Sequence, residues 1–181
     1  MIVPLGIAAT SPLLAWREPV YIISGLAGVI GLCLLLLQPL LAAGALPGLP
    51  SQRARTVHRW LGASLVVAVI VHVAGLWLTS PPDVIDALLL RSPTPFSLWG
   101  VIAMWAVFVA ATVAALRHRF RPRVWRRFHT GLAAVIVLGT STHALLIDGT
   151  MGTASKVALC ALVVAAAAKL LLSRQRWRYR G

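Results

Sequence analysis

Long, uninterrupted apolar runs constrain the fold of this chain more than any other feature. Crossing the roughly 30 Å hydrocarbon core of a bilayer takes a helix of about 20 residues. Four runs reach that length: Val20–Leu41, His58–Ser80, Ser97–Leu116 and Thr153–Leu172. A fifth, His129–Ile147, reaches it if its flanks tilt. Membrane barrels need short segments of alternating hydrophobicity, so these continuous runs exclude a barrel and predict membrane-spanning helices.

A sixth candidate lies at the start of the sequence. Ile2–Trp16 is apolar, but it is only 15 residues long and contains Pro4 and Pro12. It lacks the basic start of a secretory signal peptide. We interpret it as a shortened first transmembrane helix, or as the remainder of one that starts upstream. The sequence therefore predicts an all-α integral membrane bundle of five or six transmembrane helices.

The composition fits a chain that lies mostly in lipid. Hydrophobic residues make up 59% of the sequence and charged residues only 12%, whereas soluble domains carry about 25% charged residues. The segments between the runs are too short for a soluble domain. They also contain neither a dinucleotide-binding GxGxxG sequence nor a P-loop. We therefore expect no flavin or nicotinamide site in this chain.

The basic residues are distributed very unevenly along the chain. A net charge of +13 would suggest a nucleic-acid partner in a soluble protein. If the five runs alternate in direction, however, 14 of the 17 basic residues fall on one side, and only Arg17, Arg91 and Lys156 fall on the other. This asymmetry predicts that the basic side and the C-terminus are cytoplasmic, in an inner (plasma) membrane. We expect contacts with anionic membrane lipids there, and no nucleic-acid partner.

Two other features refine this picture. Pro81–Phe96 is rich in proline around a short apolar piece, Val84–Leu90, which predicts an extracytoplasmic loop with a short interfacial helix. Cys33 and Cys160 each lie inside an apolar run, without CxxC or CxxCH spacing. Covalent haem attachment of the c type is therefore excluded, and we expect two buried thiols rather than a disulfide.

Four of the five histidines form two pairs with the same spacing. His58 and His72 lie in one run and His129 and His143 in another, 14 residues apart in both cases. At 100° per residue, this spacing puts both members of a pair on one helix face, about 21 Å apart along the axis. His118 lies among arginines instead, and we expect it to be a solvated surface residue.

The two histidine runs are separated by one further span, so their helices should be parallel. His58 then lies level with His129, and His72 with His143. Two imidazoles at one depth on facing helices can ligate one haem iron from both sides. A single intramembrane histidine is more often a packing residue, although polar groups in the bilayer are costly enough to suggest function. Two pairs in register favour haem ligation over a proton relay or a structural role.

Residues near these histidines are compatible with a bound haem. Small residues that would let a flat porphyrin lie between helices are Gly62, Gly75, Gly131 and Gly139. Glycine is also common where membrane helices pack without a cofactor. Residues at the cytoplasmic end that could pair with haem propionates are Arg55, Arg59, Arg126 and Arg127. Each of these arginines could equally serve as a topology determinant or a lipid contact.

Three short sequences and a fourth histidine carry a resemblance to a known family. They are H-R-W-L-G at His58–Gly62, H-V-A-G-L at His72–Leu76, and W-R-R-F-H at Trp125–His129, followed by His143. Through them, Thr56–Ile147 resembles the ferric-reductase-like transmembrane domain. This superfamily includes ferric reductases, the membrane part of NADPH oxidases, and the haem subunit of the bacterial periplasmic methionine sulfoxide reductase system.

The resemblance implies two b-type haems (heme b) with four axial ligands: His58, His72, His129 and His143. It also implies one domain over residues 1–181, with a haem-binding core at 56–147. Two departures from the family are the short first helix and the missing FAD- and NAD(P)H-binding module that eukaryotic members append.

The function that follows is electron transfer rather than bond-making chemistry. Iron with two histidine ligands has no free position for a substrate, so we assign no catalytic residue. We expect electrons to come from a cytoplasmic flavoprotein or a membrane quinol. They would pass from the His58–His129 haem to the His72–His143 haem, and then to an extracytoplasmic acceptor such as ferric iron or a partner reductase.

Two alternatives stay open. One is a cytochrome b561-like quinol oxidoreductase, in which the order of the ligand helices differs. The other, with less support, is a haem-free proton-coupled transporter. The spans hold almost no acidic partner for the histidines and no pair of broken helices of the kind that transporters use.

Overall fold

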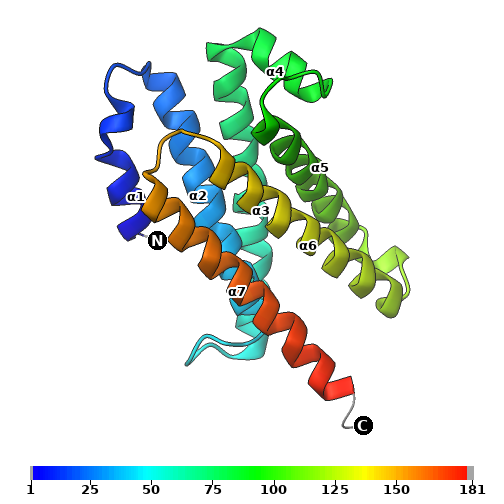
Figure 1. Cartoon of the computed structure of the whole chain (residues 1–181). Helices are drawn as coiled ribbons and strands as arrows, with labels where there is room; N and C mark the ends of the chain where they lie inside the picture. The colour runs from blue at the N-terminus through cyan, green and yellow to red at the C-terminus, as the bar shows by residue number, and fades with distance from the viewer. Residues whose placement is uncertain (1, 179–181) are drawn as a thin grey trace.

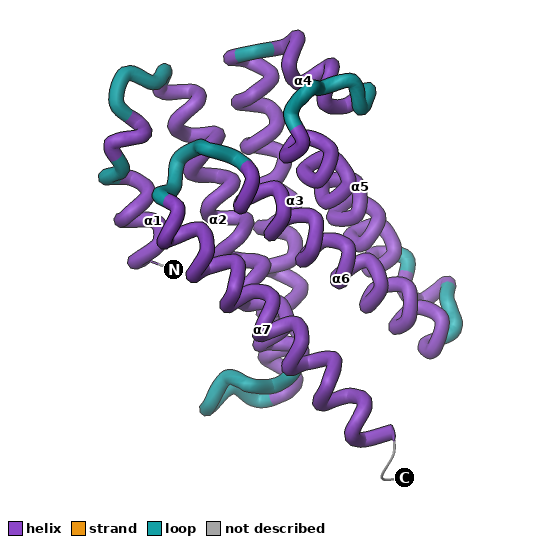
Figure 2. Tube along the Cα trace, in the orientation of Figure 1, coloured by secondary structure: helices purple, strands orange, loops and turns teal. Residues whose placement is uncertain are grey.

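The computed structural model describes residues 2–178, with side chains from residue 3 to residue 172. This part of the chain consists of α-helices and short connections, without a strand (Figures 1 and 2). The helices are α1 (Ile2–Ala9), α2 (Pro19–Ala42), α3 (Ser51–Thr79), α4 (Pro81–Leu88), α5 (Pro95–Ala115), α6 (Pro122–Leu146) and α7 (Thr153–Arg178), with short 3-10 helices η1 (Pro12–Leu14) and η2 (Arg117–Arg119). The all-α prediction is confirmed.

Five of these helices are long and apolar enough to cross a membrane: α2, α3, α5, α6 and the Thr153–Leu172 part of α7. They correspond to the five predicted runs, but α3 and α6 begin earlier, at Ser51 and Pro122. Hydropathy does not detect these extensions because they carry arginines. His58 and His129 therefore lie about two turns inside their helices, where the backbone is held on both sides.

The sixth candidate, Ile2–Trp16, is not one helix. α1 ends at Ala9, η1 follows at Pro12, and Trp16 has a positive φ of 67°. Pro12 contributes to the break because it cannot donate the backbone hydrogen bond of a continuing helix. With eight residues, α1 rises only about 12 Å. The possibility that Ile2–Trp16 spans the membrane as a single helix is therefore wrong, and α1 instead packs against α2 and α7.

Two helical hairpins form most of the bundle. α2 packs along α3, α5 packs along α6, and α7 lies against both α2 and α6 (Figure 1). Glycines permit the closest approaches. A Cβ on Gly75 of α3 would lie 2.7 Å from the Cβ of Ser24 on α2, and one on Gly139 of α6 would lie 3.1 Å from the Cβ of Ala103 on α5. These are the close contacts expected where membrane helices meet through small residues.

The outer surface of the bundle suits lipid rather than water. Large apolar side chains point outward on several spans, including Trp60 and Val67 of α3, Trp105 of α5 and Leu138 of α6. In a bilayer these side chains contact acyl chains, so their exposure has little cost. Cys33 and Cys160 lie inside the bundle as buried free thiols, as the sequence predicts.

The two ends of the bundle differ in charge. The 43–50 connection, the arginine-rich segment around η2 and the C-terminal end of α7 lie at one end (Figure 1). The opposite end carries α4 and the connection between α6 and α7. The four acidic residues belong to connections or elements at this second end: Glu18, Asp83, Asp86 and Asp148. α4 matches the short helix that Val84–Leu90 predicts.

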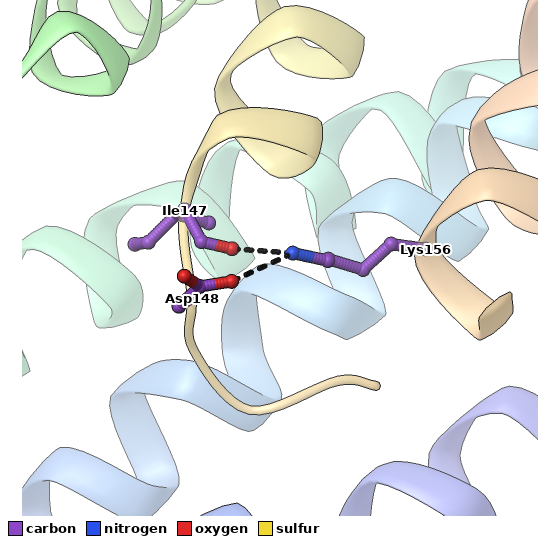
Figure 3. A network of polar contacts seen from close by, with 3 residues as sticks. All are labelled: Ile147, Asp148 and Lys156. Atoms are coloured by element: carbon purple, nitrogen blue, oxygen red, sulfur yellow. Dashed lines mark hydrogen bonds and ion pairs between the residues drawn. The ribbon is translucent and has the colours of Figure 1, made fainter. Parts of the chain in front are cut away.

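A buried lysine closes the connection between α6 and α7. Lys156 of α7 is only 5% exposed, and its Nζ donates a hydrogen bond of 2.6 Å to the backbone carbonyl of Ile147 (Figure 3). The same Nζ lies 3.6 Å from Oδ1 of Asp148, whose side chain is fully exposed. Ile147 is the C-cap of α6, so the ammonium group neutralises the negative end of that helix four residues after His143.

We predict that Lys156→Met lowers the stability of the protein. Methionine keeps most of the side-chain volume but leaves the Ile147 carbonyl without its charged donor, a loss of about 1–3 kcal/mol. The measurement is thermal unfolding in detergent, followed by circular dichroism. Lys169→Met is the matched control, because Lys169 is on the same helix but exposed. Equal melting temperatures for the two variants would show that the bond contributes nothing.

The charge difference between the two ends predicts the orientation of the chain in the membrane. Asp86→Cys, at the acidic end, should react with a membrane-impermeant maleimide in intact cells. Arg121→Cys, in the arginine-rich connection, should react only after the cells are permeabilised. Both positions are exposed, so accessibility within the protein does not limit either reaction. The reverse labelling pattern would overturn the predicted orientation.

Candidate metal and cofactor site

The four paired histidines lie on two helices that belong to different hairpins. His58 and His72 are on α3, and His129 and His143 are on α6; all four side chains are partly buried. α3 packs mainly against α2, and α6 against α5 and α7. The fifth histidine, His118, lies in η2 and is exposed, as the sequence predicts.

The structure brings the histidines together in the pairs that the spacing predicts. The ring centroids of His58 and His129 are 6.3 Å apart, and so are those of His72 and His143. The two rings are nearly perpendicular in both pairs, with interplanar angles of 73° and 81°. On α3 the two pairs are about 21 Å apart along the helix axis, so one lies toward each end of the bundle.

We call His72 and His143 the outer pair, because they lie toward the acidic end. Each ring is held by a backbone carbonyl of its own hairpin. Nδ1 of His72 donates a 2.8 Å hydrogen bond to the carbonyl of Ser24, and Nδ1 of His143 donates a 2.9 Å hydrogen bond to that of Phe96. A carbonyl can only accept, so both Nδ1 atoms carry the proton. Nε2 is then the unprotonated nitrogen of each ring, the form that binds metals.

The inner pair, His58 and His129, is held differently. Nδ1 of His58 makes no hydrogen bond of good geometry in the described part of the chain, although the backbone of Gln38 on α2 lies close to the ring. The His129 ring is stacked on the indole of Trp125, with centroids 5.5 Å apart and planes within 14° of each other. Nε1 of Trp125 is also buried without a hydrogen-bond partner in the described part. One turn before His129, an aromatic plane therefore fixes the rotation of that imidazole.

The 6.3 Å separation can be compared with two ways of joining imidazoles. A metal ion about 2 Å from each of two facing nitrogens, with each nitrogen roughly 1.1 Å from its ring centre, would place the centroids about 6.2 Å apart. A direct hydrogen bond of about 2.9 Å between the nitrogens would bring the centroids to about 5.1 Å. The observed separation of 6.3 Å in both pairs is closer to the metal-bridged distance than to the hydrogen-bonded one. Among the described residues, no cluster of three or more His, Cys, Asp or Glu side chains could hold a metal ion.

The glycines that the sequence singles out lie elsewhere than at the rings. Gly75 and Gly139 serve the helix contacts described above. A Cβ on Gly62 would meet only the side-chain amide of Gln38 within 4 Å, and one on Gly131 would meet nothing. Neither position has a histidine ring within 4 Å, and the expectation that these small residues let a flat porphyrin lie between the helices stays a prediction.

Two glycines that sequence reasoning missed do lie against the outer pair. A Cβ on Gly28 of α2 would be 3.1 Å from Nδ1 of His72, and one on Gly100 of α5 would be 2.7 Å from Nδ1 of His143. Each glycine stands four residues after the carbonyl that holds the same ring. The spacing in the sequence could have indicated this similarity. The residue that supplies the carbonyl precedes its histidine by 48 positions in one hairpin and by 47 in the other.

The arginines proposed as propionate partners are all exposed at the end of the bundle that carries the inner pair: Arg55, Arg59, Arg126 and Arg127. Four cations with no acidic residue nearby in the chain leave this rim able to bind anions. Their exposure fits a propionate contact, a lipid contact or a docking partner equally well.

The described part of the chain is therefore a multi-pass membrane bundle that contains two pairs of facing imidazoles. The chain belongs to the ferric reductase like transmembrane component family, whose model matches residues 24–140. The match covers α2 to most of α6 and includes three of the four paired histidines, ending shortly before His143. Searches of curated proteins and of solved structures each found no match.

Proposed function

We propose that this chain is a di-haem b-type transmembrane electron-transfer protein of the ferric reductase like family. The observation that carries the proposal is the pair of equal imidazole separations, 6.3 Å in both pairs. A packing or proton-relay role would not require two pairs to share the spacing of a two-ligand metal site. Family membership supports the same reading, because it suggests electron transfer within a membrane.

In this proposal His58 and His129 hold one b-type haem, and His72 and His143 hold a second. When bound, the haems supply one-electron transfer without bond making, because two axial histidines leave no open position on iron. The protein residues provide the ligands and their orientation. The carbonyls of Ser24 and Phe96 keep Nδ1 of the outer histidines protonated, so that Nε2 is the ligating atom.

The proposed direction of transfer rests on the charge difference between the two ends. The basic end would be cytoplasmic and would meet a flavoprotein or a membrane quinol as electron donor. The acidic end would face an extracytoplasmic acceptor, such as ferric iron or a partner reductase. Exposed arginines at the basic end favour a donor with an acidic docking surface, since complementary charge speeds association.

We predict that the histidines behave as two separate ligand pairs. His72→Ala and His143→Ala should each remove the same haem, because one remaining imidazole cannot hold it in the six-coordinate form. His58→Ala and His129→Ala should remove the other. Extracted haem per protein should fall from about two to about one in each variant, with complementary losses in the low-temperature absorption spectrum.

His118→Ala is the control, because His118 is exposed in η2 and should leave both haems in place. Two results would contradict the proposal. One is a wild-type protein that binds no haem in membranes supplied with it. The other is loss of the same spectral component from His58→Ala and His143→Ala, which would mean that the pairs are wrongly assigned.

We also predict that these 181 residues, purified with haem, are not reduced by NADPH alone. A nicotinamide gives up two electrons as a hydride, whereas each haem accepts one, so a flavin normally stands between them. Addition of a flavin reductase or a reduced quinone should then reduce the haems, as followed by absorbance. With an acidic flavoprotein the rate should fall as salt rises. Rapid reduction by NADPH without flavin would reveal a binding site in this chain.

A further inference from the structure

The two hairpins contain the same local arrangement around the outer pair. In α2, the carbonyl of Ser24 accepts the hydrogen bond of His72, and Gly28 follows four residues later. In α5, the carbonyl of Phe96 accepts the hydrogen bond of His143, and Gly100 follows four residues later. Two unrelated stretches of sequence thus converge on one geometry: a helical carbonyl, a glycine on the next turn, and an imidazole above both.

Helix geometry explains why the glycine stands at this position. A helical carbonyl at position i already accepts the backbone N–H of residue i+4, and it has a second lone pair for another donor. The side chain of residue i+4 leans back toward the N-terminus and covers the turn that contains this carbonyl. A Cβ on residue i+4 would therefore crowd an imidazole that approaches the free lone pair, and a glycine there removes the obstacle.

The distances show how closely each ring fills this space. A Cβ at position 100 would lie 2.7 Å from Nδ1 and 3.0 Å from Cε1 of His143. A Cβ at position 28 would lie 3.1 Å from Nδ1 and 3.2 Å from Cε1 of His72. The first contact forces the ring to move, whereas the second requires a shift of only a few tenths of an ångström.

We propose that Gly28 and Gly100 are positioning residues for the outer ligand pair. By admitting the rings to the Ser24 and Phe96 carbonyls, they set the rotation of His72 and His143 and keep their protons on Nδ1. This inference rests on the proposed haem function, and it adds an explanation of how the rings of His72 and His143 are oriented. A hydrogen-bonded Nδ1–H also makes the ligating nitrogen a better electron donor to the metal.

The inner pair provides an internal comparison. Neither Gly62 nor Gly131 would place a Cβ within 4 Å of a histidine ring. The His129 ring stacks on Trp125. Substitutions at Gly28 and Gly100 should therefore affect one ligand pair and spare the other.

The test uses Gly28→Ala and Gly100→Ala in the full chain loaded with haem, with Gly62→Ala and Gly131→Ala as matched controls near the inner pair. Electron paramagnetic resonance reports the angle between the axial ligand planes at each ferric haem, and redox titration reports each midpoint potential. The outer signal is identified as the one that His72→Ala and His143→Ala remove.

Both test variants should shift the outer resonance and the outer midpoint potential, with the larger shift in Gly100→Ala. The inner signal should stay at its wild-type position in both. The two control variants should leave the outer resonance and the outer midpoint potential at their wild-type positions, because their added methyl groups meet no histidine ring. If Gly100→Ala does not fold, Gly28→Ala alone decides by the same criteria.

The proposal is overturned if Gly28→Ala leaves the outer signal unchanged, or if it shifts inner and outer signals equally, as general loosening of the bundle would. These outcomes differ from failure of the proposed function, which would appear as wild-type protein without two haem signals.

Discussion

Inside a bilayer no water is available to satisfy polar groups, and most of this structure follows from that constraint. Helices satisfy their own backbone, which is why five long apolar helices form the bundle. Each of the two nitrogens of an imidazole needs a hydrogen-bond partner or a metal. A neighbouring helix offers mainly carbonyl oxygens, each of which keeps one lone pair that can accept a further hydrogen bond. His72 and His143 donate to such carbonyls through Nδ1. The second nitrogen of each ring is then an acceptor that no backbone carbonyl can satisfy.

That second nitrogen is the basis of the proposed ligand pairs. Two neutral imidazoles that both donate through Nδ1 can offer each other only lone pairs, so they cannot hydrogen-bond to each other. A cation between them satisfies both lone pairs at once, and the centroid distance of 6.3 Å leaves room for it. The pairs also join hairpins whose histidine helices pack chiefly on their own partners. A group ligated by the two histidines of either pair would therefore link the α2–α3 hairpin to the α5–α6 hairpin.

Much of the fold could be predicted from the sequence, because in a membrane protein the length of an apolar run predicts a spanning helix. The five spans and the surface position of His118 are confirmed, and the register of the histidine pairs agrees with simple helix geometry. The helix boundaries were predicted less well, because a proline or a few arginines can end or extend a helix independently of its hydropathy. Pro12 divides Ile2–Trp16, and arginine-bearing turns extend α3 and α6 beyond their apolar runs.

The glycines show a second limit of the sequence. Proximity along the chain singles out glycines on the histidine helices themselves, whereas the two glycines that lie against the outer rings, Gly28 and Gly100, are on neighbouring helices. Which glycine faces a ring depends on how two helices pack across a hairpin, and no spacing within one helix contains that information. The stacking of Trp125 on His129 is different, since four residues on one helix place the two side chains on one face.

His143 lies beyond residue 140, where the family match ends, so its place in the site needs an argument of its own. The structure supplies one through the repetition of the outer arrangement. His143 stands to the Phe96 carbonyl and Gly100 as His72 stands to the Ser24 carbonyl and Gly28, and His72 lies within the matched region. A packing role for His143 would not require α5 to present a carbonyl and a glycine in the same arrangement as α2. It would also not require the centroids of His143 and His72 to be as far apart as those of His58 and His129. Lys156 also donates a hydrogen bond to the carbonyl of Ile147, the C-cap of α6, which stands four residues after His143. This contact holds the end of the helix that carries His143 in place. The similar arrangement in the two hairpins thus supports the inclusion of His143 in the proposed site, although it lies outside the family match.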